Sequence, residues 1–221
     1  MGNDQAPKFF RDRHEDITFL PKYFRDNGFY AWTIGKVFHG NIPKGTYDKV
    51  EWASGEFSTF NCTNDTPELK HDHFCPRPDD EDHKLPDTNV KDKVVEFLRE
   101  QGRLRKENAE ETKPFFATVG FYRPHLAYTV PQRYLKLYNK LDRAPNRFFP
   151  IKTKRIAYYP WKGEYSGQEF AHLKLNGSVG DKMTEALDKV NRGMYYACLS
   201  YIDDLTSFLT ELVIGIENLV S

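Results

Sequence analysis

The stretch "PFFATVGFY", Pro114 to Tyr122, decides the fold of this chain. It is a nearly continuous apolar run, of the kind that forms a strand buried on both faces of a parallel sheet. A second run, "FYAWTIG", is aromatic and β-branched and predicts a strand from Phe29 to Ile34. Residues 88–111, between the two runs, place apolar side chains at helical spacing. This alternation predicts an α/β fold with a mainly parallel or mixed sheet flanked by helices.

Further helices are expected on either side of these elements. A short helix in "DITFLPKYFRDNG" ends at Gly28, and the central helix takes Thr88 or Asn89 as its N-cap. Another short helix begins at Pro131, and a long helical pattern covers Asp181–Leu212. The segment "IENLVS" that follows looks like a strand that has only just started.

Composition sets the class of protein and excludes some partners. A chain of 221 residues with 39% apolar content can bury one sizeable core, as one domain or part of a larger one. Its 32 basic and 32 acidic residues cancel without a long basic stripe, which argues against nucleic acid or an anionic membrane as a partner. No apolar run approaches the roughly 20 residues of a membrane span, and residues 1–16 lack the apolar core of a signal peptide. Residues 40–88 show neither the helical nor the strand spacing of apolar residues, which predicts a long surface excursion.

Cysteines and glycosylation motifs point to a secretory route. Cys62 and Cys75 flank a polar loop, and a disulfide between them would stabilise the fold by roughly 3 kcal/mol; two free thiols are the alternative. N-x-S/T acceptors stand at Asn61, Asn64 and Asn176. The third cysteine, Cys198, lies in a helical pattern and is expected to be a small buried apolar residue.

Basic side chains and imidazoles follow both predicted strands. Lys36 and His39 come after the first strand, and Arg123 and His125 come after the second, where Pro124 ends the ladder. If the strands are parallel, all four side chains reach the same edge of the sheet. An ammonium and imidazoles suit a compact oxyanion such as a sulfate or phosphate ester. The alternative is a solvated lysine with histidines that only make structural hydrogen bonds.

Four motifs in register carry a resemblance to a known family. They are "GKVFH", "PFFATVGFYRPHLAY", "AYYPW" and "YYACLSYIDD". Over roughly residues 17–212 the chain resembles the sulfatases, especially the branch that removes the 2-O-sulfate of iduronate units in glycosaminoglycans. The resemblance implies an alkaline-phosphatase-like fold, with residues 1–221 as a single partial catalytic domain. It also implies a sulfated glycosaminoglycan partner, a lysosomal or secreted location, the Cys62–Cys75 disulfide and a glycan at Asn176.

The same resemblance assigns roles to individual residues. Lys36 would contact the sulfate, His39 would support the formylglycine nucleophile, and His125 would hydrogen-bond the sulfate and assist the leaving oxygen. Arg123 stands where the branch more often has lysine and would contact substrate. The family's cofactors are Ca2+ and a formylglycine made from C-x-P-S-R. None of the three cysteines begins C-x-P-x-R, so the ligands for both cofactors are expected outside this chain, and the chain alone is expected to be inactive.

Two other functions stay open. Between His71 and His83 the sequence offers three imidazoles and several carboxylates, which could ligate zinc, although a solvated acidic loop has the same composition. A noncatalytic secreted glycoprotein that keeps an anion-binding groove is the other alternative.

Overall fold

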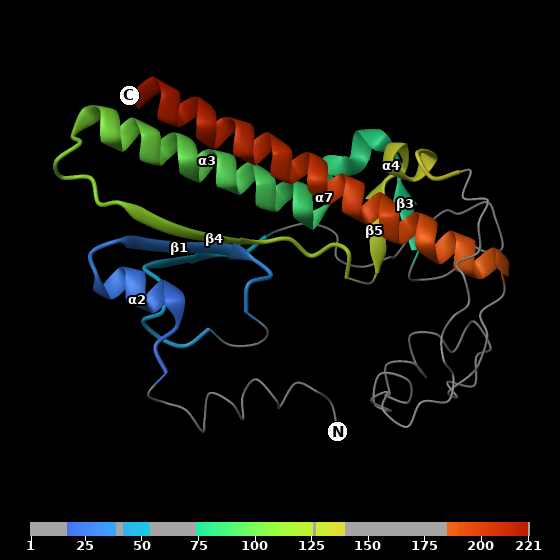
Figure 1. The fold of residues 1–221 in the computed structure, drawn as a ribbon, viewed down its shortest axis with the longest axis horizontal. Helices are drawn as coiled ribbons and strands as arrows, with labels where there is room; N and C mark the ends of the chain where they lie inside the picture. Colours follow the sequence, from blue (N-terminus) through green and yellow to red (C-terminus); the bar gives the residue numbers. More distant parts are fainter. Residues whose placement is uncertain (1–16, 39–41, 54–73, 126, 140–184, 221) are drawn as a thin grey trace. The chain divides into compact units, whose positions relative to one another are not determined.

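The computed structural model describes residues 17–38, 42–53, 74–125, 127–139 and 185–220 (Figure 1). Within these ranges the chain divides into two compact units. The first unit lies within Met1–Phe57, Asp80–Arg123 and Tyr201–Ser221, and the second within Ser58–Asp79 and Pro124–Ser200. No described helix is both long and apolar enough to span a membrane.

The first unit is a three-stranded parallel sheet with helices on both faces. Its elements are α2 (Leu20–Asp26), β1 (Tyr30–Gly35), β2 (Lys49–Glu51), η1 (Asp79–Lys84, mostly in this unit), α3 (Pro86–Glu107), β4 (Phe115–Gly120) and the part of α7 (Glu185–Val220) from Tyr201 onward. The strand order is β2-β1-β4 and both pairings are parallel. Helix α2 lies on one side of the sheet, and α3 with α7 on the other (Figure 1). The predicted α/β fold with a parallel sheet is therefore confirmed.

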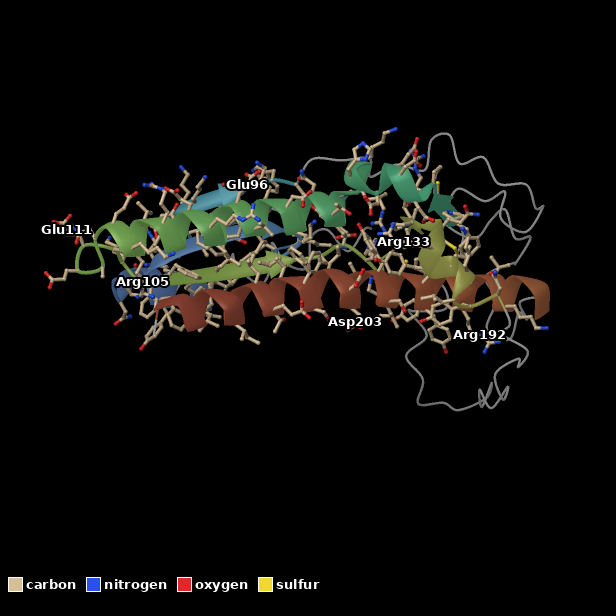
Figure 2. The ribbon with its side chains drawn as sticks, turned by 90° about the horizontal axis from the view of Figure 1, so that it is seen from above. Glu96, Arg105, Glu111, Arg133, Arg192 and Asp203 are labelled. Carbon is tan, nitrogen blue, oxygen red and sulfur yellow. The ribbon has the colours of Figure 1, made fainter. Side chains whose placement is uncertain are left out.

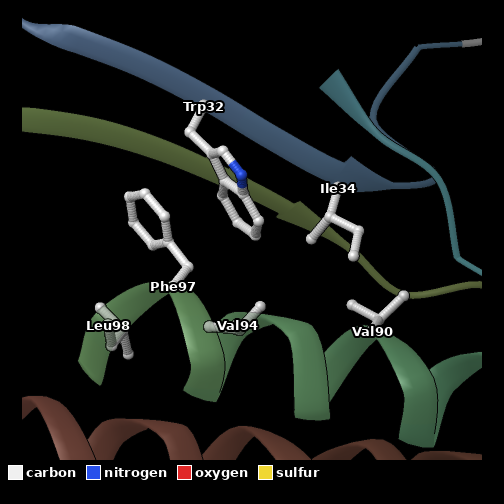
Figure 3. Packing of buried hydrophobic residues seen from close by; sticks show 6 residues of the cluster. All are labelled: Trp32, Ile34, Val90, Val94, Phe97 and Leu98. Carbon is white, nitrogen blue, oxygen red and sulfur yellow. The ribbon is translucent and has the colours of Figure 1, made fainter. Parts of the chain in front are cut away.

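The face of the sheet toward α3 holds the apolar core (Figure 3). Trp32 and Ile34 of β1 point at α3, where the buried partners are Val90, Val94, Phe97 and Leu98. The rings of Trp32 and Phe97 stack with centroids 4.3 Å apart and planes 9° apart, and Phe115 of β4 meets Phe97 edge-on at 5.1 Å. Exposed charged side chains, among them Glu96, Arg105 and Asp203, cover the outer surfaces of α3 and α7 (Figure 2). Burial of this aromatic layer is the main stabilising term for the unit.

The opposite face of the sheet combines an aromatic stack with a hydroxyl network. Phe24 of α2 stacks on Phe116 of β4 with centroids 4.2 Å apart. Thr118 donates to the Thr33 hydroxyl opposite it, 2.8 Å away, and shares a 2.8 Å hydrogen bond with the hydroxyl of Tyr47. These bonds satisfy polar groups that the sheet and the following loop bury.

The sequence predicted the end of α2 correctly and the start of α3 incorrectly. Gly28 has φ +88°, so it ends α2 in the left-handed conformation, as predicted. The predicted cap of α3 at Thr88 or Asn89 is wrong, because α3 begins at Pro86 and its N-cap residue is Leu85. Proline suits the first turn of a helix, where its missing N–H has no intrahelical acceptor.

Two other expectations are corrected. The strand expected in "IENLVS" is wrong, because α7 stays helical to Val220; a single glycine, Gly215, costs only about 1 kcal/mol in a helix. Described parts of the predicted surface excursion, residues 40–88, hold β2, the 3-10 helix η1 and the buried strand β3 (Phe74–Arg77). These strands are three and four residues long, too short for a period to be visible in the sequence.

The second unit is a small two-stranded parallel sheet. Strand β3 pairs with β5 (Tyr128–Pro131), which α4 (Gln132–Lys136) follows directly, and α7 up to Ser200 belongs to the same unit. Tyr128 meets Tyr195 of α7 edge-on at 6.1 Å, and the hydroxyls of Tyr138 and Ser200 are 2.5 Å apart. The short helix was expected to begin at Pro131; Pro131 is its N-cap instead, and β5 before it was not predicted.

We expect Phe97→Ala to lower the free energy of unfolding by about 4 kcal/mol, because it removes the ring that contacts both Trp32 and Phe115 and leaves a cavity. Phe208→Ala is the matched control: that ring is 48% exposed, with the Lys91 ammonium 5.3 Å from its centroid, and its loss should cost about 1 kcal/mol or less. Urea denaturation measures both. Equal losses for the two variants would contradict this account of the core.

Candidate functional site

The carboxyl ends of β1 and β4 are brought into contact by a pair of glycines. Gly35 lies opposite Gly120 in the register, and the amide of Lys36 donates to the carbonyl oxygen of Gly120 over 2.7 Å. Gly35 has φ +78°, and a methyl group there would overlap the Gly120 carbonyl oxygen. A methyl group on Gly120 would overlap the Lys36 carbonyl oxygen. The two strands therefore release their loops side by side, as expected for parallel neighbours.

Two cations stand at this edge, which we call the rim: Lys36 after β1 and Arg123 after β4. The side chain of Lys36 is partly exposed, whereas Arg123 is only 6% exposed. Partial burial lowers the pKa of Lys36 and the positive charge of Arg123 lowers it further, while the carboxylate of Asp87 acts in the opposite direction. Asp87 is joined to this edge by the hydrogen bond from the backbone N–H of Arg123, and Lys36 follows the adjacent strand.

Asp87 is the buried anion of the rim. It lies in the first turn of α3, is 1% exposed, and its carboxylate accepts the backbone N–H groups of Tyr122 at 2.5 Å and Arg123 at 3.3 Å. Burial raises the pKa of Asp87, and it is opposed by the charge of Arg123, by the two backbone hydrogen bonds and by Lys36. One side chain thus fixes the loop after β4 to the start of α3.

A second buried contact holds α7 against the same helix turn. The hydroxyls of Thr88 and Tyr201 are 2.6 Å apart, and Tyr201 is fully buried. Burial raises the pKa of Tyr201, so the phenol stays neutral and the pair keeps its hydrogen bond at any physiological pH. Thr88 was expected to cap α3, but its hydroxyl bonds across the core to α7.

The structure brings together two of the four predicted rim residues. Lys36 and Arg123 lie at the ends of adjacent strands. His39 lies outside the described residues, and His125 is exposed and belongs to the second unit. The catalytic and substrate-binding roles of these residues stay predictions.

Other predicted sites fall largely outside the described residues. These are Asn61, Asn64, Asn176, Cys62, His71 and His73. Of the three histidines in the zinc hypothesis, His83 lies in the described residues: it is exposed, and its Nδ1 lies 3.0 Å from the carbonyl oxygen of Asp80. In the described ranges no three His, Cys, Asp or Glu side chains converge as metal ligands. Cys198 has no exposed surface, which confirms its prediction as a small buried residue.

The family's two cofactors, formylglycine and Ca2+, need a C-x-P-S-R cysteine and free carboxylate ligands. No cysteine of the chain stands in C-x-P-x-R, and the carboxylate of Asp87, which contacts the loop after β4, already accepts two backbone N–H groups. The described residues therefore do not fit formylglycine or Ca2+. Neither group enters the chemistry derived from this rim.

Asp87 and Tyr201 were missed from the sequence. The motif "LPDT" around Asp87 is a helix-start signal, since proline and an acidic residue favour the first turn, and it could have moved the predicted start to Pro86. No local signal could have shown that Asp87 bonds a loop 35 residues away.

Comparison with known proteins identifies the family. The family model described as "Sulfatase" matches residues 2–213. The chain belongs to the sulfatase family. Its fold is the alkaline-phosphatase-like fold of that family, and the sulfatases are sulfuric ester hydrolases.

Individual sulfatases are similar at low identity. Iduronate 2-sulfatase of Mus musculus is 26% identical over 88% of this chain and 36% of its own length, and that of Homo sapiens is 25% identical over 96% and 40%. A sulfatase of Formosa agariphila is 30% identical over 59% of the chain and 27% of its own length. The chain thus spans 40% or less of the length of these relatives.

We expect Gly120→Ala to destabilise this sulfatase chain by about 3 kcal/mol, because the new methyl group has to displace the Lys36 backbone. Gly102→Ala in α3 is the matched control: nothing lies within 4 Å of the added methyl group, and it should stabilise the chain by about 1 kcal/mol through helix propensity. Thermal unfolding measures both. A neutral Gly120→Ala would contradict the close contact of the strand ends.

We expect the stability difference between wild type and Asp87→Asn to grow as pH falls from neutral toward about 4. Because burial raises the pKa of Asp87, the native state binds its proton more tightly than the unfolded state, and wild-type stability from this group rises on acidification. The asparagine variant lacks this pH-dependent contribution to the free energy of unfolding. Urea denaturation at a series of pH values gives the difference, and a difference that shrinks in acid would contradict the buried carboxylate.

Proposed function

We propose that this chain is the middle of a sulfatase catalytic domain, and that the full-length protein hydrolyses the 2-O-sulfate of iduronate units in glycosaminoglycans. The observation that carries the proposal is the placement of Lys36 and Arg123 at the carboxyl ends of adjacent parallel strands. In α/β sheets this is the edge where ligands bind. The similarity to two iduronate 2-sulfatases supports the choice of substrate class.

In this proposal Lys36 is the group that meets the sulfate. Its ammonium is partly exposed at the rim, where it can neutralise the negative charge of a sulfate ester and hydrogen-bond its oxygens. Partial burial around it removes competing water and strengthens that contact. His125 would hydrogen-bond the sulfate and assist the leaving oxygen, His39 would support the nucleophile, and Arg123 would add positive charge.

A secretory route fits the same proposal. Cys75 is disulfide-bonded and Cys198 is not, which supports the predicted Cys62–Cys75 bridge. With glycans at Asn61, Asn64 or Asn176, this bridge would be typical of a lysosomal or secreted enzyme.

A second candidate applies to the chain as it stands. Its three cysteines lie outside C-x-P-x-R, which favours a noncatalytic secreted glycoprotein that binds a sulfated anion at the rim. The two functions differ in whether the full-length protein hydrolyses a sulfate ester. If it is a sulfatase, its full-length transcript should encode C-x-P-S-R upstream of Met1, whereas a noncatalytic glycoprotein needs no such motif. In both cases the purified 221-residue chain should release no sulfate from a 2-O-sulfated disaccharide.

We expect Lys36→Ala in the full-length protein to lower kcat/KM for a 2-O-sulfated iduronate disaccharide by about a hundredfold or more, because the charge that faces the sulfate is lost. Lys44→Ala, in an exposed turn of the same unit, is the matched control and should leave kcat/KM unchanged. Sulfate release measures both. Wild-type activity in Lys36→Ala would overturn the proposed role of the rim.

A further inference from the structure

We infer that Asp87 is a positioning residue for Arg123: its carboxylate holds the backbone of the loop after β4, and this hold keeps Arg123 at the rim. The inference rests on the proposed function, in which the rim binds the sulfate group and Arg123 adds positive charge there. It gives Asp87 a part in the reaction that is exerted through the backbone of other residues, without contact to the substrate.

The hold consists of two hydrogen bonds from successive residues. One carboxylate oxygen of Asp87 accepts the N–H of Tyr122 at 2.5 Å, and the other accepts the N–H of Arg123 at 3.3 Å. Successive N–H groups of a regular strand point in opposite directions, whereas a turned backbone can direct both at one anion. The carboxylate therefore keeps the chain out of the strand conformation just after β4 has ended.

Both sides of the hold have little freedom. Asp87 lies in the first turn of the 22-residue helix α3 and is 1% exposed. Val90 and Val94, one and two turns further along α3, belong to the apolar core beneath the sheet. On the loop side, Arg123 precedes Pro124, and a residue before proline is restricted to extended conformations. The position of the Arg123 backbone is thus tied to the core through a short side chain.

A short tether keeps the same residue near the end of β1. Gly120 is the last residue of β4 in the ladder, and its carbonyl oxygen accepts the Lys36 amide at 2.7 Å. Three residues of chain span at most about 10 Å, so the Arg123 backbone stays within that distance of Gly120. The bonds to Asp87 select one of the directions that this tether allows. Misplacement of a substrate-positioning group by about 1 Å can cost a hundredfold in rate, so this selection matters for the reaction.

Two substitutions separate the hold from the charge of Asp87. Asp87→Ala and Asp87→Asn both remove the negative charge. Asparagine keeps one acceptor oxygen, which suits the closer donor, the N–H of Tyr122, and its amide nitrogen cannot accept the N–H of Arg123. An effect of charge alone would be equal in the two variants, whereas the loss of the hold is partial in asparagine and complete in alanine.

The first test is a double-variant cycle in the full-length protein with a 2-O-sulfated iduronate disaccharide. Asp87→Ala should lower kcat/KM about tenfold or more, and Asp87→Asn should lower it less. In the Arg123→Gln background, Asp87→Ala should lower kcat/KM by about threefold or less, because the side chain that it displaces is already gone. A purely structural role of Asp87 would give the same loss in both backgrounds.

The second test needs no activity and measures amide hydrogen exchange in the 221-residue chain. In Asp87→Ala the amides of Tyr122 and Arg123 should exchange about tenfold faster or more, because each loses a charged acceptor. In Asp87→Asn the Arg123 amide should accelerate while the Tyr122 amide stays protected. The Lys36 amide, which donates to Gly120, should keep its wild-type rate in both variants.

Asp92→Ala is the matched control. Its carboxylate lies at an exposed position of α3 and pairs with Lys91 at 2.6 Å. Its removal takes the same charge from the same helix without touching the loop after β4. It should change neither kcat/KM nor the exchange of the Tyr122 and Arg123 amides.

The outcomes distinguish two failures. If the wild-type full-length protein releases no sulfate, the proposed function fails. If it is active but Asp87→Ala causes the same loss in both backgrounds, or leaves the Tyr122 and Arg123 amides at wild-type exchange rates, the inference about Asp87 is overturned. Should Asp87→Ala not fold, Asp87→Asn decides: faster exchange at Arg123 alone supports the hold, and equal acceleration at Tyr122 and Arg123 overturns it.

Discussion

The rim depends on one buried carboxylate. Asp87 accepts the N–H groups of Tyr122 and Arg123, and this contact ties the exit of β4 to the first turn of α3. Because Asp87 has almost no exposed surface, its ionised form is stabilised by those two donors and by the cations around it. Without the carboxylate, the loop after β4 would lose these two hydrogen bonds to the first turn of α3.

The contact between Asp87 and the loop after β4 depends on the packing that fixes the ends of β1 and β4. On the α3 side, the stack of Trp32 on Phe97 sets the height of the helix above the sheet. At the strand ends, Gly35 and Gly120 allow the backbone to approach closely enough for the Lys36 amide to reach the Gly120 carbonyl oxygen. The aromatic packing, the glycine pair and the buried Asp87 carboxylate together place the Lys36 ammonium at the edge of the sheet.

Sequence patterns located the long elements and missed what lies between them. The apolar run of β4 and the aromatic run of β1 predicted parallel strands, and the structure pairs the two, with Lys36 and Arg123 after their carboxyl ends. The expected burial of β4 on both faces is wrong, because β4 ends the strand order β2-β1-β4 and its residues are partly buried or exposed. The short strands β2 and β3 carry too few residues for a period. The N-cap of α3 was placed three or four residues late, because the polar side chains of Thr88 and Asn89 were taken as candidate caps. Asp87 was missed because its partners are distant in sequence. Burial of Arg123 could not be read from its position after a strand.

The most direct measurement of the central claim is a crystal structure of the full-length protein with sulfate bound. The account predicts the Nζ atom of Lys36 about 3 Å from a sulfate oxygen, with the Tyr122 N–H still donating to the Asp87 carboxylate. Asp87 turned away from the Tyr122 N–H, or Lys36 directed into solvent away from the sulfate, would contradict it.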